Sequence, residues 1–338
     1  MIDPAKTRMW TEACEAHVAV ATQLAANRDA VAALADRLRD DPPRAVMTCA
    51  RGSSDHAATF AKYLIETRLG IPTASAAPSV ASVYGAPSAA EGMLCIAISQ
   101  SGRSPDLIAT VEAAKRGGAL AVALVNDPGS PLAAAADHVL PLHAAPETSV
   151  AATKSFIASL AAVASLAAAW AGDESLDEAL SATPNLLARA WDCDWAPLTD
   201  RLAGARGLYV IGRGLGLGVA QEAALKLKET CGLHAEAFSA AELRHGPMAL
   251  VGPDLPLLVF RQSDETEESV DELICDVAAR GAEVFVTGTD ALPSVRHDPV
   301  LEPMLQIQSF YRAAVTLSVR RGFDPDHPPH LAKVTETV

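Results

Sequence analysis

The residues best suited to chemistry lie in a short segment rich in hydroxyl groups, which runs from Ser99 to Ser104. This segment follows an apolar stretch and precedes Pro105, a pattern that predicts the end of a strand and the start of a helix with Ser104 as its N-cap. Small residues in such a turn let backbone N–H groups face a ligand at the positive end of the helix dipole, which suits a phosphate group. An ordinary capped turn is the alternative for this segment taken alone.

A second hydroxyl-rich turn, Arg51-Gly52-Ser53-Ser54-Asp55, follows an earlier apolar stretch. In an open parallel sheet, ligands bind at the carboxyl ends of adjacent strands, where the strand order reverses. Two such turns at one edge of a sheet favour a ligand site more than either turn alone. Both turns lack the lysine pattern of a nucleotide-binding P-loop.

Candidate acid–base groups lie in the second half of the chain. Glu222, Lys226 and Glu229 are spaced so that they share one face of a helix, and this segment taken alone favours a solvated row of ion pairs over a functional site. Further on, His245 lies in an Arg-His-Gly-Pro turn, where an imidazole could carry a proton near neutral pH. A loop histidine without a role is the alternative there.

These residues require a framework of alternating strands and helices. Apolar stretches at 45–49, 94–98 and 119–124 predict strands, and the segments 57–68 and 105–116 between them have the length of helices. This alternation predicts β-α-β units and a parallel sheet with helices on both faces.

The same pattern then repeats. The segment 208–214 resembles 47–52, and Gln262-Ser263 falls at the same offset, 162 residues, from Gln100-Ser101. We therefore predict two copies of one open α/β domain, with a single large Rossmann-like domain as the alternative. The glycine-rich segment 212–218 has Leu217 where a dinucleotide fingerprint needs its third glycine, so neither a nicotinamide nor a flavin cofactor is expected.

The composition excludes several classes of protein. A net charge of −14 and a pI of about 5.0 disfavour nucleic-acid binding, and a chain that is 50% hydrophobic is not disordered. No secretory signal is visible, the six cysteines are widely separated and the histidines are scattered, so we expect a cytoplasmic protein without disulfides or a metal site. The apolar run 156–171 is expected to be a buried helix rather than a membrane span.

Five motifs occur in an order that resembles the tandem sugar-isomerase (SIS) domain family, as found in the isomerase half of glucosamine-6-phosphate synthase. The resemblance extends from Met9 to Lys333 and rests on the segments 99–102, 150–154, 224–229, 242–247 and 331–333. It implies two tandem SIS domains, each an open parallel sheet flanked by helices. The implied parts are an N-terminal helical segment (1–34), a first SIS domain that binds the phosphosugar (35–172), a linker (173–199), a second SIS domain (200–328) and a tail (329–338).

The resemblance also implies roles for individual residues. Glu229 is the base that moves a proton between C1 and C2 of the sugar, His245 opens the sugar ring from the neighbouring subunit, and Lys333 and Lys226 lie near the sugar. A homodimer with composite sites is therefore implied, and no cofactor is required. The residues implied to bind the substrate and its phosphate are Gly52, Ser54, Ser99, Gln100, Ser101, Ser104 and Val150.

Three positions depart from the family pattern. Arg51 stands where cysteine is usual, Asp55 where an aromatic residue or histidine is common, and His330 where asparagine precedes Leu-Ala-Lys. In addition, Ile2 rather than cysteine follows Met1, and the stretch before the first strand is too short for a glutaminase domain. We therefore expect no use of glutamine as an amine donor.

The expected activity is that of a stand-alone member of the family, a deaminase that converts glucosamine 6-phosphate into fructose 6-phosphate and ammonia. The alternatives are an isomerase or aminotransferase acting on another hexose or hexosamine phosphate, such as the galactosamine or tagatose type, and a phosphosugar sensor. The loop 261–266, which corresponds to 99–104, has gained Asp264 and Glu265. Because these carboxylates would repel a phosphate, we expect one phosphosugar site per chain.

Overall fold

The computed structural model describes residues 2–333 of the chain. Contacts divide these residues into two compact units, each with its own sheet. The Ser99 unit comprises residues 18–147, 154–181 and 332–333, and the Glu229 unit comprises residues 2–17, 148–153 and 182–331.

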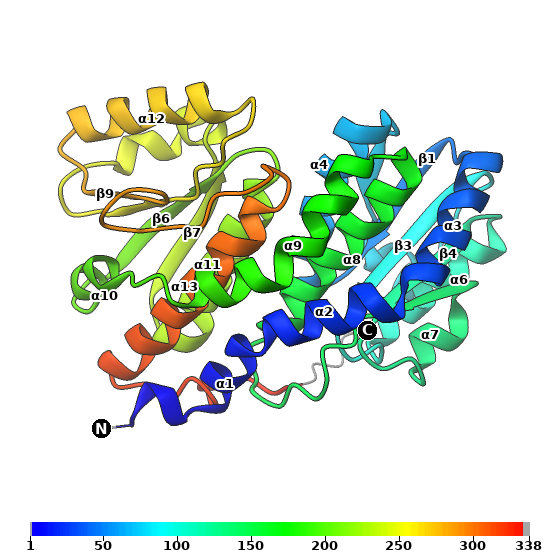
Figure 1. Cartoon of the computed structure of the whole chain (residues 1–338), viewed down its shortest axis with the longest axis horizontal. Coiled ribbons are helices and arrows are strands. Elements are labelled where there is room, and N and C mark those ends of the chain that lie inside the picture. Colours follow the sequence, from blue (N-terminus) through cyan, green and yellow to red (C-terminus); the bar gives the residue numbers. More distant parts are fainter. Residues whose placement is uncertain (1, 334–338) are drawn as a thin grey trace. The chain divides into compact units, whose positions relative to one another are not determined.

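The sheet of the Ser99 unit has five parallel strands in the order β2-β1-β3-β4-β5 (Figure 1). Its central strands are apolar and buried along almost their whole length, as is usual for a sheet covered on both faces. The register places Ala45 beside Met93 and Leu94 beside Leu120. The strands are β1 (Ala45–Cys49), β2 (Thr73–Ser75), β3 (Met93–Ser99), β4 (Leu120–Val125) and β5 (His138–Pro141).

Helices cover this sheet in two layers. Helices α6 and α7 share a hydrophobic core with β1, β3 and β4, whereas α4 contacts β1 and β3 and packs with α8, which also packs against α3. The helices are α2 (Ala16–Ala26), α3 (Arg28–Asp40), α4 (Ser53–Leu69), α5 (Pro78–Ser82), α6 (Pro105–Arg116), α7 (Pro131–Ala135), α8 (Lys154–Ala171) and α9 (Glu174–Trp191), which begins in this unit and ends in the other.

Helix α8 is the apolar run that the sequence predicts to be buried. By length and composition alone it could cross a membrane, but 83% of its 18-residue window is buried inside the structure. Its alanines and leucines pack against α3 and α4. The prediction of a buried core helix is therefore confirmed.

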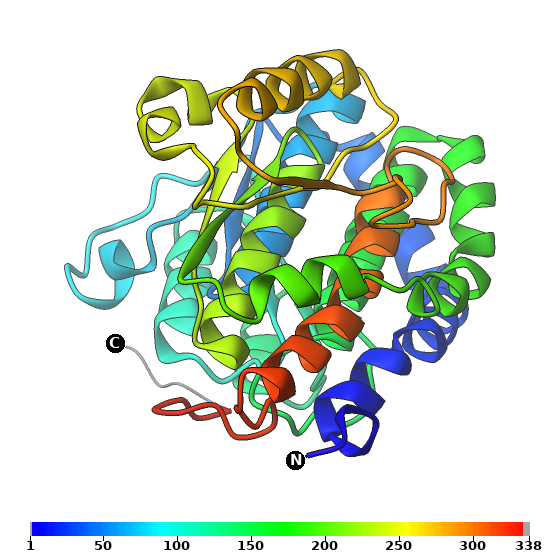
Figure 2. The same ribbon diagram turned by 90° about the vertical axis from the view of Figure 1, so that its left-hand side faces the viewer.

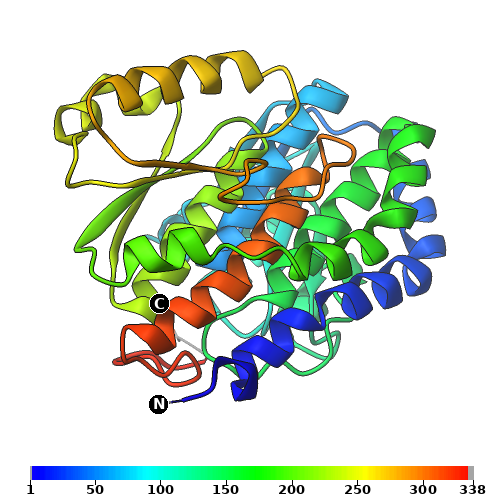
Figure 3. The ribbon, with the colours of Figure 1, turned by 60° about the vertical axis from the view of Figure 1, so that its left-hand side comes forward.

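The Glu229 unit has a four-stranded parallel sheet in the order β7-β6-β8-β9. Helix α12 covers one face of this sheet, and α11 and α13 lie on the other (Figures 1 and 3), where Figure 2 shows α13 in orange-red beside α11 in yellow-green. The strands are β6 (Gly207–Gly212), β7 (His234–Ser239), β8 (Leu257–Val259) and β9 (Val284–Val286). The helices are η1 (Pro4–Lys6), α1 (Arg8–Cys14), α10 (Ala196–Leu202), α11 (Gly216–Cys231), η2 (Glu242–His245), η3 (Pro247–Leu250), α12 (Glu267–Ala279) and α13 (Glu302–Arg320).

The two sheets have the same topology, because the strand order β2-β1-β3-β4 corresponds to the strand order β7-β6-β8-β9. The prediction of two open parallel α/β sheets is confirmed. In each sheet the strand order reverses between two neighbouring strands, which are β1 and β3 in one sheet and β6 and β8 in the other. Open α/β folds bind ligands at such a reversal point. Between the two sheet-containing regions, most of the segment 173–199 is helical, since α9 spans Glu174–Trp191.

Candidate active site

The first turn of the Ser99 unit lies at the reversal point, where β1 ends. Gly52 has a φ of +55°, a left-handed conformation that glycine adopts without strain, and it is the N-cap of α4. The helix begins at Ser53, so Ser54 and Asp55 belong to its first turn rather than to the preceding loop, which corrects the sequence prediction. Ser54 is half-buried, at the helix end where N–H groups are left without helical acceptors.

The segment 99–104, here called the Ser99 loop, follows the adjacent strand β3. The hydroxyl of buried Ser99 accepts a hydrogen bond from the backbone N–H of Gly102 at 3.0 Å, and the hydroxyl of Ser101 accepts one from Arg103 at 3.3 Å. Gly102 has a φ of +62°, and a Cβ there would lie 2.1 Å from the hydroxyl oxygen of Ser130. Only glycine therefore fits at this position, and Ser99 shapes the loop from inside.

The Ser99 loop leads into α6 as the sequence predicts, with Ser104 as N-cap and Pro105 in the first turn. The Ser104 side chain nevertheless makes no capping hydrogen bond with this helix. Gln100, Ser101 and Ser104 are all half-buried. The N-terminus of a 12-residue helix therefore lies beside hydroxyl groups that a ligand can reach, an arrangement suited to an anion.

Arg51 links the two turns. Its guanidinium donates to the carboxylate of Asp106, in the first turn of α6, at distances of 2.8–2.9 Å. The Asp106 side chain is fully buried, whereas that of Arg51 is half exposed. Beside it, burial raises the pKa of the Asp55 carboxyl, although the charges of His56 and Arg51 oppose the rise. The sequence singles out Arg51 and Asp55, but it did not indicate Asp106 as a partner.

In the Glu229 unit, Lys226 lies between two carboxylates on α11. Its ammonium is 2.5 Å from Oε2 of Glu229 and 3.4 Å from Oε1 of Glu222, and Tyr311 of α13 donates its hydroxyl to Glu222 at 3.1 Å. Lys226 and Glu222 are completely buried, whereas the Glu229 side chain is 21% exposed. The predicted shared face is confirmed, but the solvated row of ion pairs that the segment alone favours is wrong, because Glu222 and Lys226 are buried.

Burial gives this row of charges its chemical meaning. A buried ammonium or carboxylate is stable only when it is paired and hydrogen-bonded, and here each charge has a partner. The row leads from Tyr311 and Glu222 in the core to the partly exposed carboxylate of Glu229. Only that last group can meet a solute.

His245 is exposed at the end of η2, followed by Gly246 with a φ of +134°. Among residues 2–333, no hydrogen bond joins His245 to Glu229. Val150 lies in the segment 148–153 of the same unit, which is anchored by Glu12. This buried carboxylate accepts hydrogen bonds from the backbone and hydroxyl groups of Thr148 and Ser149, including one from the Thr148 backbone N–H at 2.5 Å. Glu12 is a positioning group that the sequence did not reveal.

Lys333 belongs to the Ser99 unit, where its ammonium lies 3.3 Å from Oε2 of Glu147. Glu147 is buried and also accepts from the backbone and hydroxyl groups of Ser155, in the first turn of α8. Upstream, His330 has a φ of +65°, a conformation that asparagine adopts more readily than most residues. The asparagine usual at this position in the family therefore suits the local backbone.

The structure thus brings the predicted residues together in two groups. Gly52, Ser54, Ser99, Gln100, Ser101, Ser104 and Lys333 lie in the Ser99 unit, and Val150, Lys226, Glu229 and His245 lie in the Glu229 unit. Across residues 2–333, no group of three or more His, Cys, Asp and Glu side chains is arranged to hold a metal ion.

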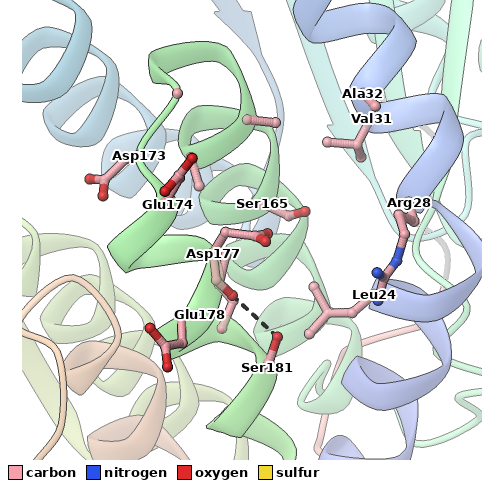
Figure 4. A pocket seen from close by; sticks show the side chains of 14 residues that line it. Leu24, Arg28, Val31, Ala32, Ser165, Asp173, Glu174, Asp177, Glu178 and Ser181 are labelled. Atoms are coloured by element: carbon pink, nitrogen blue, oxygen red, sulfur yellow. Dashed lines mark hydrogen bonds between the residues drawn. The ribbon is translucent and has the colours of Figure 1, made fainter.

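A hollow of about 440 Å³ in the Ser99 unit contains none of these residues (Figure 4). Arg28 and Leu24 approach it from one side, and Asp177, Glu178 and Ser181 from α9 on the other. The hydroxyl of Ser181 is hydrogen-bonded to the backbone oxygen of Asp177, so it belongs to the helix itself. This hollow is separate from the Ser99 loop.

Comparison with known proteins now gives the family. A solved structure from Silicibacter pomeroyi DSS-3, provisionally described as a phosphosugar isomerase, is 44% identical with a TM-score of 0.91, covering 95% of this chain and 100% of that chain. Glucosamine-6-phosphate deaminase from Thermotoga maritima is 25% identical with a TM-score of 0.79, covering 98% of this chain and 100% of that chain.

A curated relative is glutamine–fructose-6-phosphate aminotransferase (isomerizing) from Methanothermobacter thermautotrophicus. It is 35% identical over 296 residues, which are 83% of this chain and 50% of that protein, so the chain spans about half the length of the curated relatives it matches. The sequence profile of the SIS domain matches residues 42–169 and 201–297, more than half of the chain. As its five ordered motifs predict, this protein belongs to the SIS domain family.

Proposed function

We propose that this protein is a phosphosugar isomerase of the deaminase type, which converts glucosamine 6-phosphate and water into fructose 6-phosphate and ammonia. The observation that carries the proposal is the buried row Glu222–Lys226–Glu229, which ends in a partly exposed carboxylate. A protein that only sensed a phosphosugar would need the Ser99 loop, but it would not need a supported acid–base group. The similarity to a glucosamine-6-phosphate deaminase and to a glutamine–fructose-6-phosphate aminotransferase supports the choice of substrate.

In this proposal the Ser99 loop holds the phosphate. Ser101 and Ser104 offer hydroxyl groups, the start of α6 offers backbone N–H groups, and Ser54 adds a hydroxyl at the start of α4. Donors fixed by the fold lose little freedom when the ligand binds, which favours affinity. Arg51, held by buried Asp106, adds positive charge at the same strand ends.

Glu229 then moves one proton. In the open-chain aldehyde, the carboxylate removes the proton from C2 while the C1 oxygen gains a proton, which gives an enolamine. The same carboxylic acid returns its proton to C1, so that the nitrogen becomes a C2 imine, and water hydrolyses this imine to the ketose and ammonia. Lys226 holds Oε2 of Glu229 and fixes the orientation of the carboxylate. The sequence of steps consumes one water and needs no redox change.

His245 and Lys333 complete the proposal. His245, which is exposed, assists ring opening, and Lys333 contacts the open sugar. We also propose that His245 acts on the site of a neighbouring subunit in a homodimer. Mixing inactive Glu229→Gln and His245→Ala proteins under conditions of subunit exchange is then expected to restore part of the activity. Exchange without restored activity would place both residues in the site of one chain.

The deciding experiment measures ammonia and ketose phosphate together over a panel of hexosamine and hexose 6-phosphates. We expect equal amounts of both products from glucosamine 6-phosphate. Ketose phosphate without ammonia, formed from an unsubstituted aldose phosphate, would instead show a simple isomerase. Binding of a phosphosugar without either product would favour the sensor.

A further inference from the structure

At the second reversal point of the strand order, between β6 and β8, a side chain of the protein itself binds the loop that follows β8. The segment 261–266, here called the Ser263 loop, follows β8 as the Ser99 loop follows β3. Its serine does not face an open position. The backbone N–H of Ser263 donates to Oε2 of Glu302 at 2.8 Å, and the Ser263 hydroxyl donates to Oε1 of Glu302 at 2.9 Å.

Glu302 is held in this position by a long helix and by burial. It is the first residue of the 19-residue helix α13 and is only 3% exposed. One turn later, Gln306 accepts from the side-chain amide of Gln262 at 3.0 Å and donates to the carbonyl oxygen of Arg261 at 2.6 Å. The first two turns of α13 therefore hold the loop by its side chains and its backbone.

Two of the three charged side chains of the Ser263 loop, those of Arg261 and Asp264, are also bound elsewhere. Arg261 forms a two-point ion pair with Asp271 and a further ion pair with Glu267, both on α12. The carboxylate of Asp264 accepts from the backbone N–H and hydroxyl of Thr266. Asp264 is thus occupied within its own loop, and the sequence-based reason for the absence of a phosphate there was incomplete.

These contacts give the Glu302 carboxylate the environment of a bound anion. Each of its oxygens receives one donor from the loop, and charge-assisted hydrogen bonds of this kind are stronger than neutral ones. The two carboxylate oxygens thus accept from a backbone N–H and a hydroxyl, the same kinds of donor that bind the oxygens of a phosphate. We propose that the β6–β8 reversal point is an anion site which the chain fills permanently with its own Glu302 carboxylate.

This proposal goes beyond the proposed function, since it holds for any phosphorylated ligand. With the second site occupied from within, a phosphosugar can bind only at the Ser99 loop. One ligand per chain follows, and the number of sites is set by a buried glutamate rather than by the repulsion from Asp264 and Glu265 that the sequence suggested. Glu302 is accordingly a specificity determinant of the fold and not a catalytic residue.

The test removes the internal anion and offers an external one. In a Ser101→Asp background, which blocks the Ser99 loop, Glu302→Ala should leave a cavity that small carboxylates can enter. We expect 100 mM acetate, compared with chloride at equal ionic strength, to raise the unfolding temperature of the Glu302→Ala protein by about 3 °C. The matched Ser101→Asp protein, with Glu302 in place, should shift by less than about 1 °C.

Two further variants decide the interpretation. Adding Ser263→Ala to the Glu302→Ala protein should abolish the effect of acetate, because the hydroxyl donor is lost. An equal acetate effect with and without Glu302, or an effect that survives Ser263→Ala, would overturn the proposal. If Glu302→Ala does not fold, a double-mutant cycle of Glu302→Gln and Ser263→Ala replaces it. Coupling that changes the unfolding equilibrium at least about 3-fold is then expected, and additive effects would overturn the proposal.

Discussion

The two sheets of this chain have the same strand order, but the long helix that packs beside each of them begins with a buried residue of opposite charge. In the Ser99 unit the long helix α8, which packs on α4, begins with buried Lys154, whereas in the Glu229 unit its counterpart α13, which packs on α11, begins with buried Glu302. Glu302 binds the Ser263 loop directly, while the described contacts of Ser101 in the Ser99 loop stay within that loop. Under both proposals, a few buried side chains decide whether the same backbone is open to an anion or closed against it, without any change of fold.

The proposed function predicts the largest effect at Glu229, the proposed proton-transfer group. Glu229→Gln keeps the shape and the contact with Lys226 but removes the carboxylate base. Turnover should fall by about 10²–10⁴-fold, and phosphosugar affinity should change little because the Ser99 loop is intact. Steady-state kinetics together with calorimetric titration measure both quantities. Near-normal turnover would show that Glu229 only ends a structural ion-pair row.

A smaller effect is expected from the two glycines of the Ser99 unit, which form a matched pair. Both have positive φ, but a Cβ at Gly102 would collide with Ser130, whereas one at Gly52 would meet no atom within 4 Å. Gly52→Ala should lower the free energy of unfolding by about 1 kcal/mol through backbone strain alone. Gly102→Ala should cost more, about 2–4 kcal/mol, and should also weaken phosphosugar binding because the loop must shift.

Denaturant unfolding and ligand titration of the two variants measure this difference. The expected result is a larger loss of stability and of phosphosugar affinity in Gly102→Ala than in Gly52→Ala. Equal losses of stability, with phosphosugar affinity unchanged in both, would show that the precise backbone of the Ser99 loop is not required for binding. The Ser99 loop would then differ less from the Ser263 loop, as a binding site, than their contacts indicate.

Much of this arrangement could be predicted from the sequence. Apolar runs located β1, β3, β4 and β6 to within one or two residues at most ends, and the Ser-Pro pair located the start of α6. The edge strands β2, β5 and β7 are not predicted from the sequence, because they are only partly buried and their residues lack the apolar signal of a central strand. Strands at the edge of a sheet need little hydrophobic patterning to pair with a buried neighbour.

The site was only partly predictable, and for a different reason. The spacing of Glu222, Lys226 and Glu229 defines a helical face, but the same spacing serves a buried face and a solvated one. Contacts such as Glu12 with Ser149 join residues 137 positions apart, and no local pattern indicates them. Glu302 was missed because its role depends on a helix start meeting a loop about 40 residues earlier, a contact that packing alone creates.

The smallest effect is expected at the ion pair of Arg261, the one cation of the Ser263 loop. The hydrogen-bonded ion pair with Arg261 lowers the pKa of the Asp271 carboxyl. A carboxyl whose pKa is lower in the folded state stabilises the fold at pH values above its unfolded pKa, near 4, and this contribution is lost as the pH falls through the folded pKa. Because Asp271 is partly exposed, Asp271→Asn should cost less than about 1 kcal/mol at pH 7.

The difference between the wild-type and Asp271→Asn proteins should therefore shrink as the pH is lowered below about 4, and 1 M salt should reduce it at pH 7. Denaturant unfolding at several pH values measures it. Inorganic phosphate could instead stabilise the Asp271→Asn protein, in which Arg261 is released and Glu302 is still present. The pairing of Arg261, rather than Glu302, would then be the reason why the Ser263 loop binds no phosphate. We expect no such stabilisation, because the Ser263 donors remain bound to the Glu302 carboxylate.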